Sequence, residues 1–224
     1  MQTLTQQHPW KQRLVLPAYQ LKAAASYAGV TPKTVRNWQT SAGSGAALAH
    51  RHHGESLSYL QLQELAIVSA MRKIGVKLEK IRVAREYLAT LLNCEFPFAD
   101  ERVKSDSQDI LVALAKGDLP GLPRNSILIA NTRGQYVWPE IIGKRFKEFE
   151  YERGLALKWH LTSDKRVIID PRVSFGAPTV KGVPTWALQG RATSGEPMLD
   201  IADDFGLTLD DVKSALKFEH SILH

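Results

Sequence analysis

Apolar residues recur every three to four positions through much of the N-terminal part of the chain, and this spacing predicts amphipathic helices. Gly29 ends a first short helix, and Thr31 followed by Pro32 opens a second. Threonine caps a helix N-terminus well, and proline fits the first helical position. Gly75 separates two longer helices. The four predicted helices cover residues 21–28, 32–39, 58–74 and 78–92, and Arg85 interrupts the apolar face of the last one.

Two N-terminal segments lack this spacing. Residues 1–18 contain Pro9 and Pro17, and we expect them to form a loose arm. Residues 40–56 are rich in Gly, Ala, Ser and His, and they are predicted to form a loop or a small β-wing.

The pattern changes in the second half of the chain, where short apolar runs alternate with turn residues. The sequence Asn131-Thr132-Arg133-Gly134 lies between two such runs and is typical of a β-hairpin. The remaining predictions are a short helix over residues 108–114, a helix over 139–149, strands over 155–161 and 166–169, and mainly helices after Trp186. The predicted fold is therefore mainly α with a small β component, in the α+β class.

Positive charge is concentrated at the N-terminal end. Residues 1–95 carry 12 Lys and Arg against 5 Asp and Glu, whereas residues 96–224 carry 17 against 18. An excess of positive charge confined to one part of a chain indicates a surface for a polyanion. The N-terminal part is therefore a candidate nucleic-acid-binding region.

Composition excludes several other classes. Cys94 is the only cysteine, so neither an internal disulfide framework nor a cysteine-rich metal site is possible. No apolar run is long enough to span a membrane, and residues 1–10 lack the apolar core of a signal peptide. We expect a cytoplasmic protein without a cofactor, a metal or a membrane partner.

Residues 19–38 have the pattern of a helix-turn-helix. Small residues at Ala24, Ala25 and Ala28 allow close helix packing, and Gly29 makes the turn. Val30, Val35 and Trp38 are expected to face the core. Polar side chains then project from the second helix, as a helix that enters the major groove requires. They are Lys33, Thr34, Arg36 and Asn37.

This segment resembles the DNA-binding domain of the MerR family of bacterial regulators. The resemblance covers residues 19–38 without a gap, resumes at Leu57-Ser58-Tyr59 and continues through residues 70–81. It implies that the four polar residues of the second helix face the major groove, with Arg36 the best candidate for a guanine contact. It also implies that the wing over residues 40–56 lies along the DNA backbone.

Arg51, His53 and Tyr59 complete the predicted DNA contacts. The cluster His50-Arg51-His52-His53 could also bind a metal, but Glu55 is the only acidic residue nearby, so a phosphate-contacting loop is the preferred interpretation. The chain departs from the MerR pattern in two respects. Its last N-terminal helix ends near Leu92 without a long coiled coil, and no cysteine cluster follows.

A second helix-turn-helix pattern covers residues 199–219, with Gly206 at the turn and Thr208 as the expected cap of the second helix. Five aspartates at positions 200, 203, 204, 210 and 211 would place negative charge where DNA phosphates should lie. We therefore predict a structural or protein-binding role for this second pattern.

The C-terminal part resembles the domain of unknown function four-three-three, which occurs in antitoxins of the VapB type. The resemblance follows an Asp-Pro pair, a Gly- and Pro-rich turn and the second helix-turn-helix, in order across residues 167–219. It implies a PIN-domain ribonuclease toxin as the partner, which the antitoxin binds and silences while repressing the shared promoter on duplex operator DNA.

These readings predict three domains and a homodimer. Residues 1–95 would form a MerR-like winged helix-turn-helix, residues 96–165 a mixed α/β connector suited to dimerisation, and residues 166–224 an antitoxin-like domain. The predicted function is that of a DNA-binding antitoxin and autorepressor. The alternative is a MerR-like transcriptional regulator that responds to a small molecule and has no toxin partner. We expect no enzymatic activity, because the sequence has no nucleophile-base order, no phosphate loop and no metal signature.

Overall fold

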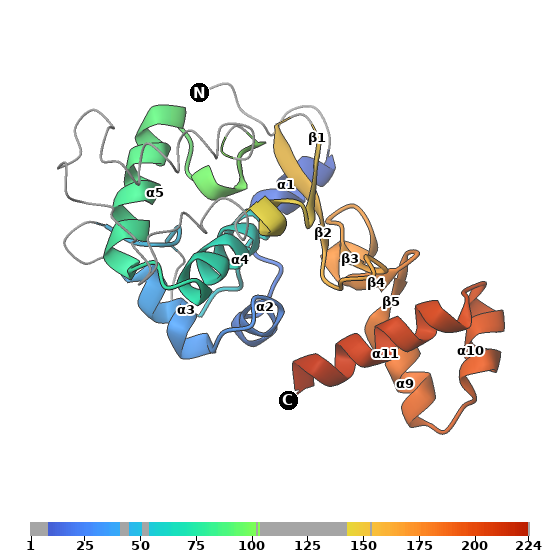
Figure 1. Ribbon diagram of the computed structural model, residues 1–224. Helices are drawn as coiled ribbons and strands as arrows, with labels where there is room; N and C mark the ends of the chain where they lie inside the picture. Colours follow the sequence, from blue (N-terminus) through green and yellow to red (C-terminus); the bar gives the residue numbers. More distant parts are fainter. Residues whose placement is uncertain are drawn as a thin grey trace.

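The computed structural model describes residues 9–40, 45–50, 54–101, 103, 143–152 and 154–223. We call residues 9–103 the head and residues 143–223 the tail. The head is helical, and the tail extends from one side of it as a small sheet followed by helices (Figure 1). The head contains α1 (Pro9–Val15), α2 (Leu21–Tyr27), α3 (Pro32–Gln39), α4 (Tyr59–Lys73), α5 (Leu78–Leu92) and the short 3-10 helix η1 (Pro97–Ala99).

The tail begins with a five-stranded antiparallel sheet in the simple order β1-β2-β3-β4-β5. In the register of the sheet, Trp159 of β2 lies opposite Phe149 of β1 on one side and Ile169 of β3 on the other. The strands are β1 (Phe149–Glu152), β2 (Leu155–His160), β3 (Val167–Ile169), β4 (Pro178–Val180) and β5 (Val183–Pro184), and the 3-10 helix η2 (Ser174–Gly176) precedes β4. The predicted α+β class with a small β component is confirmed.

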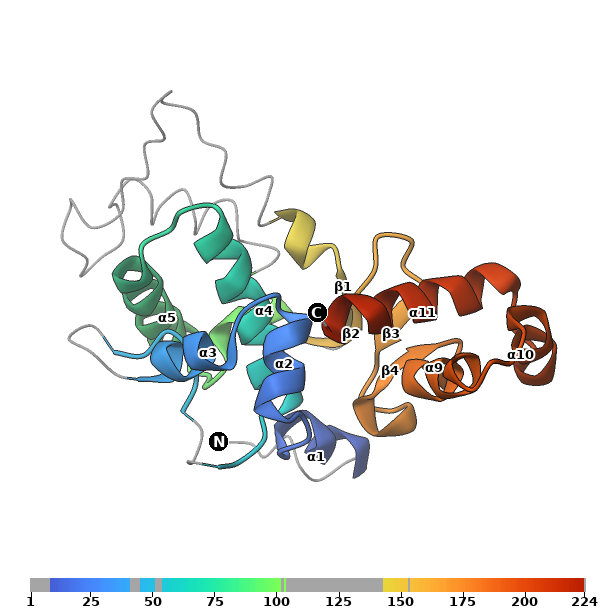
Figure 2. The same cartoon turned by 90° about the horizontal axis from the view of Figure 1, so that it is seen from below.

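Three helices complete the tail: α9 (Thr185–Thr193), α10 (Met198–Phe205) and α11 (Leu209–Leu223). Seen from below, α11 runs from the far end of the tail back to the head and ends beside α2 (Figure 2). Helix α2 near the start of the chain is therefore in contact with α11 near its end.

Two hydrophobic clusters fill the interior. The first contains the buried residues of the head together with Phe149, Leu157, Trp159 and Ile169 from the sheet. The second contains Val167 and Val180 of the sheet with the buried faces of α9, α10 and α11. Because Ile169 of strand β3 belongs to the first cluster and Val167 of the same strand belongs to the second, the sheet joins the packing of the head to that of the tail.

A buried ion pair lies at the centre of the head. The side chain of Glu64 on α4 is completely buried, and it accepts hydrogen bonds from Arg85 Nε at 3.2 Å and from the backbone N–H of Ala49 at 3.1 Å. Burial raises the pKa of Glu64 to about 6, and Arg85 opposes this increase. Arg85 also donates to the carbonyl of Glu95. The arginine that interrupts the apolar face of α5 is thus the counter-charge of a buried carboxylate.

The structure corrects several expectations. Residues 1–18 were expected to form a loose arm, but residues 9–15 form helix α1. This helix is possible because proline is tolerated at the first helical position, and Leu14 is buried in the core of the head. Of the helix expected over 139–149, the described part is helical only over residues 143–146, and Phe149 begins β1. No strand occurs in residues 45–50 or 54–56 of the expected wing. The helix expected over 108–114 and the hairpin around 131–134 lie outside the described residues.

Among the described residues, no helix combines the length and the apolar character that a membrane span requires.

Replacing Arg85 by methionine is expected to lower the free energy of unfolding by about 3–5 kcal/mol, because Glu64 would keep a buried charge without a partner. The double variant Glu64→Gln/Arg85→Met should recover a large part of this loss, since an amide oxygen can still accept from Ala49 N without a counter-charge. Urea-induced unfolding at pH 7 measures both values. A double variant no more stable than Arg85→Met would contradict this account of the pair.

Candidate nucleic-acid interface

Helices α2 and α3 occupy the segment in which the N-terminal helix-turn-helix was predicted. Gly29 has a positive φ of 65°, and the turn closes with a hydrogen bond from Val30 N to Ala25 O at 2.9 Å. The hydroxyl of Thr31 accepts from Thr34 N at 3.1 Å, and Pro32 is the first residue of α3. The predicted cap and turn are confirmed, and they fix where α3 begins.

The two faces of α3 differ in character. Val35 and Trp38 are buried in the head, whereas Lys33, Arg36 and Asn37 are exposed. Within the described part of the chain, these three exposed side chains make no hydrogen bond or ion pair. The structure therefore brings three of the predicted site residues together as unengaged donors on one helix.

Thr34 is placed differently from the other three. It is only half-exposed, and its hydroxyl lies 2.9 Å from that of Thr31. Its hydroxyl therefore already belongs to the N-terminal cap of α3 while the side chain keeps some access to solvent.

Hydrogen bonds hold the segment that follows α3. Ala47 N and Leu48 N donate to the carbonyl of Trp38, and Gln39 Nε2 donates to the carbonyl of Ala49 at 3.4 Å. Gln61 at the start of α4 donates to the carbonyl of His50 at 2.7 Å. Residues 47–50 are therefore held by hydrogen bonds to α3 and to α4. The predicted contact residues Arg51 and His53 lie outside the described residues.

The expected DNA contact of Tyr59 is wrong. Its side chain is fully buried, and its hydroxyl donates to the carbonyl of Leu157 in β2 at 3.0 Å. Burial holds the pKa of this phenol well above its usual range. Tyr59 therefore fastens the head to the sheet of the tail and has no access to a nucleic acid.

The second helix-turn-helix is formed by α10 and α11. Gly206 adopts the left-handed conformation at the turn, and Thr208 caps α11 through a hydrogen bond from Asp211 N to its hydroxyl at 3.2 Å. In return Asp211 accepts from Thr208 N at 3.0 Å. The cap and the turn were predicted correctly.

The five aspartates of this second pattern do not all lie free at the surface, as was expected. Asp211 was expected at the surface, but its side chain is only 1% exposed and forms ion pairs with Arg166 and with Lys181. Asp204 pairs with Arg191 at 2.6 Å. Two of the five aspartates are therefore neutralised by the fold. Asp200, Asp203 and Asp210 remain exposed at the helical end of the tail.

Contacts between head and tail were not predicted from the sequence. The rings of Tyr27 in α2 and Phe218 in α11 lie 6.0 Å apart. Gly176 has a positive φ, and a Cβ atom built on it would lie only 2.2 Å from the hydroxyl of Tyr19. Arg13 lies over the ring of Phe175, 5.2 Å from its centroid. Burial raises the pKa of Tyr27 to about 12, as expected for a phenol covered by a close-packed interface.

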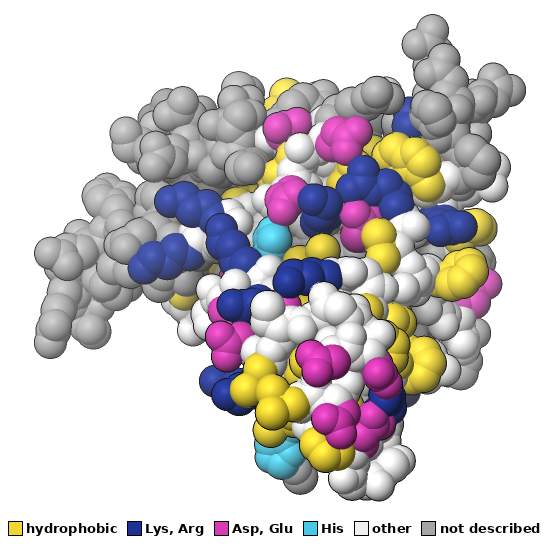
Figure 3. Space-filling model, turned by 90° about the vertical axis from the view of Figure 1, so that its right-hand side faces the viewer, with side chains coloured by type: hydrophobic (Ala, Val, Ile, Leu, Met, Phe, Trp, Pro, Cys, Tyr) yellow, Lys and Arg dark blue, Asp and Glu magenta, His cyan; other side chains and the backbone are white. Residues whose placement is uncertain are grey.

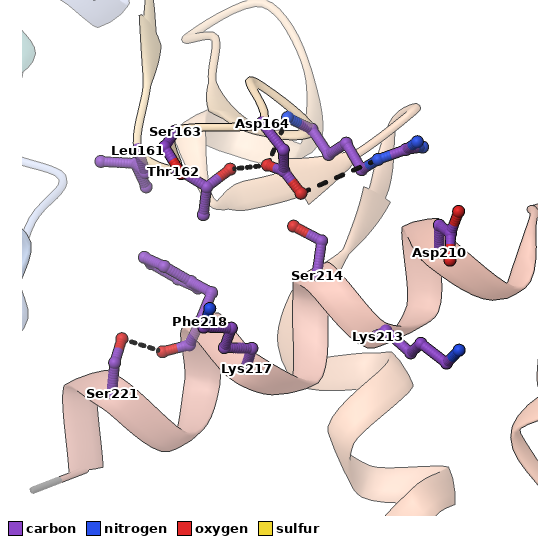
Figure 4. A pocket seen from close by; sticks show the side chains of 11 residues that line it. Leu161, Thr162, Ser163, Asp164, Asp210, Lys213, Ser214, Lys217, Phe218 and Ser221 are labelled. Carbon is purple, nitrogen blue, oxygen red and sulfur yellow. Dashed lines mark hydrogen bonds and ion pairs between the residues drawn. The ribbon is translucent and has the colours of Figure 1, made fainter.

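The tail also contains an open groove with a volume of about 540 Å³. The turn between β2 and β3 forms one wall, and a face of α11 forms the other (Figure 4). Within the described residues, no group of three or more His, Cys, Asp or Glu side chains is arranged to hold a metal ion.

Comparisons with known proteins extend over both halves. Residues 167–218 match the family described as "Protein of unknown function (DUF433)". The chain is 25% identical over 226 residues to a protein of Mycobacterium tuberculosis (strain ATCC 25618 / H37Rv) named "Putative antitoxin VapB45", which covers 91% of this chain and 94% of that relative. These two matches support a likeness to antitoxins of the VapB type.

A solved structure is also similar. The crystal structure of Rv2018 from Mycobacterium tuberculosis has a TM-score of 0.74 and 26% sequence identity, and the match covers 91% of this chain and 99% of that one. The similarity thus includes the arrangement of most of the chain and is not limited to the C-terminal segment that matches the family.

Acidification should weaken the tail through Asp211. Burial alone would raise the pKa of this carboxyl, but hydrogen bonds from Lys181, Thr208 and Arg166 outweigh burial and hold it well below its usual range. A depressed pKa means that the stabilisation is present above the unfolded-state pKa of about 4 and is lost as the pH falls further. Thermal unfolding of the wild type and of Asp211→Asn between pH 7 and pH 3 should show the variant less stable at pH 7, with the difference shrinking toward pH 3. A constant difference would contradict the assignment.

Proposed function

We propose that this protein is a cytoplasmic, DNA-binding antitoxin that represses its own operon. In this proposal the head binds duplex operator DNA through α3, and the tail binds and silences a PIN-type ribonuclease toxin. Similarity to a protein named as an antitoxin, over 91% of the chain, supports the antitoxin role. The observation that carries DNA binding is the exposed polar face of α3, whose opposite face is fixed in the core by Val35 and Trp38.

Several features of the head favour duplex DNA over another polyanion. A helix whose apolar back is held by a second helix is the arrangement that enters a major groove. Arg36 offers a guanidinium that can bind the O6 and N7 atoms of guanine, and Asn37 can pair with adenine. Lys33 near the start of α3 is suited to a phosphate. The excess positive charge of residues 1–95 would draw the head toward DNA from a distance.

A homodimer fits this mode of binding. Two copies related by a two-fold axis would read two half-sites separated by about one helical turn or a multiple of it. Operator DNA with such a symmetric repeat is the expected target.

The helical end of the tail has the character of a protein-binding surface. Large apolar side chains are exposed there, with Trp186 of α9 at 62% and Leu199 of α10 at 61% exposure. Figure 3 shows the side of the molecule on which the tail lies, and acidic and hydrophobic side chains lie together over its lower part. A ribonuclease must hold polyanionic RNA on a basic surface, so an acidic and apolar tail is complementary to it.

The groove in the tail favours a second candidate function, that of a MerR-like transcriptional regulator that responds to a small molecule without a toxin. Its wall helix α11 is in contact with α2, so that a ligand there would lie close to the DNA-binding head. The two functions differ in one testable respect. An antitoxin should form a complex with a nuclease encoded beside its gene, whereas a regulator of this second kind should not.

Changing Arg36 to alanine is expected to weaken specific DNA binding by about 1–3 kcal/mol, because a bidentate base contact is lost. Because the side chain of Arg36 is exposed, we expect this substitution to leave the free energy of unfolding unchanged. Gel-shift titration with the protein's own upstream DNA measures the effect, and Lys147→Ala on the tail is the matched control. Equal affinity of wild type and Arg36→Ala would reject the assignment of α3.

Reversing the character of the tail surface should break the toxin complex. The double variant Leu199→Ser/Asp203→Lys removes an exposed apolar anchor and places a positive charge against a basic partner, and we expect it to lose at least about 2 kcal/mol of binding. Calorimetry with the nuclease encoded beside this gene measures it, and Lys147→Glu is the control. Wild-type binding by the double variant would contradict this surface, whereas no complex with the wild type would contradict the antitoxin role itself.

A further inference from the structure

The groove between the β2–β3 turn and α11 has an ordered wall. Asp164 in the turn accepts from the hydroxyl of Thr162 at 2.6 Å and from Arg166 N at 3.2 Å. Burial alone would raise the pKa of Asp164, but these bonds and one from Ser214 on α11 lower it. Figure 4 shows Ser214 pointing from the helix toward Asp164 across the groove. The negative charge of Asp164 is thus met by donors of the protein itself.

The opposite wall carries two lysine side chains that form no ion pair with other described residues. Lys213 and Lys217 lie four residues apart on α11, line the groove and are exposed. Neither makes a hydrogen bond or an ion pair within the described residues. Asp210 is one turn before Lys213 and is exposed without pairing to it, and the neighbouring Asp211 points inward to Arg166 and Lys181. Two like charges at this spacing destabilise a helix slightly, and an anion between them would relieve that cost.

We propose that this groove is a binding site for a small molecule that carries a phosphate monoester. The phosphate would lie between Lys213 and Lys217, and the hydroxyl of Ser163 on the facing turn would be a further donor. The rest of the ligand would extend toward Leu161 and Phe218 at the apolar end of the groove. This site does not include α3, and it borders the acidic helical end of the tail at Asp210.

The groove is better suited to a phosphate than to a carboxylate, because its available cations are lysines. A planar carboxylate is best matched by the fork of an arginine, but Arg166 is committed to Asp211. The remaining cations are ammonium groups, which act as point charges and suit the several oxygens and the higher charge of a phosphate.

A ligand in the groove would be one side chain away from the head. Phe218 lines the groove, and its ring lies 6.0 Å from that of Tyr27 in α2. Occupancy would therefore change the surroundings of the first helix of the N-terminal helix-turn-helix.

Calorimetric titration of the full-length protein with adenosine monophosphate tests the site, with adenosine and inorganic phosphate as partial probes. We expect the monophosphate to bind, inorganic phosphate to bind more weakly and adenosine not to bind. The double variant Lys213→Gln/Lys217→Gln should lower the affinity for the monophosphate about tenfold or more, because two charge-assisted contacts are lost. Both side chains are exposed, so circular dichroism and the melting temperature should be unchanged.

Lys147→Gln, just before strand β1 in the tail, is the matched control, because it removes one exposed lysine that does not line the groove. It should bind the monophosphate as the wild type does. Absence of binding to the wild type, equal affinity for adenosine, or an equal loss in the Lys147→Gln protein would each overturn the proposal. None of these results depends on DNA or on a toxin, so they leave the proposed function to its own tests.

Discussion

The buried carboxylate of Glu64 holds together the parts of the head on which the position of helix α3 depends. Helix α3 has only 8 residues, a length at which an isolated helix is unstable in water. Its position is therefore set by what surrounds it, namely the core beneath Trp38 and the segment over residues 45–50. Glu64 fixes that segment through Ala49 and α5 through Arg85. A single charged group, costly to bury, thus determines where the exposed side chains of α3 can reach.

The sheet plays the corresponding role between the two halves. Ile169 of β3 packs with the head and Val167 of the same strand packs with the helices of the tail. Tyr59 and Gln63 of α4 both donate to carbonyls of β2. Together with the contact between Tyr27 and Phe218, these bonds fix the sheet and α11 of the tail against the head. In the proposed antitoxin, a partner bound to the tail would therefore act on a structure that is continuous with the DNA-binding helices.

Local signals in the sequence predicted local structure well. The caps at Thr31 and Thr208 and the turn glycines Gly29 and Gly206 all behave as expected, because each depends only on residues within one helical turn. The spacing of Val35 and Trp38 likewise separated the buried face of α3 from its exposed one. The failures have a common cause in long-range contacts. Tyr59 and Asp211 are polar residues whose partners lie 98 and 45 positions away, so no local pattern indicates that they are buried.

The close approach of Tyr19 to Gly176 has an evolutionary consequence. Any side chain at position 176 would collide with the phenol, and the backbone there also has a positive φ. The glycine lies within the segment that matches a family model, while the tyrosine lies far outside it in the head. If a tail of this kind were joined to an unrelated head, no side chain would fill the space above Gly176 that Tyr19 occupies here. The two parts of this chain are therefore expected to have diverged together as one unit of inheritance, and chimaeras between distant relatives should require both residues from the same parent.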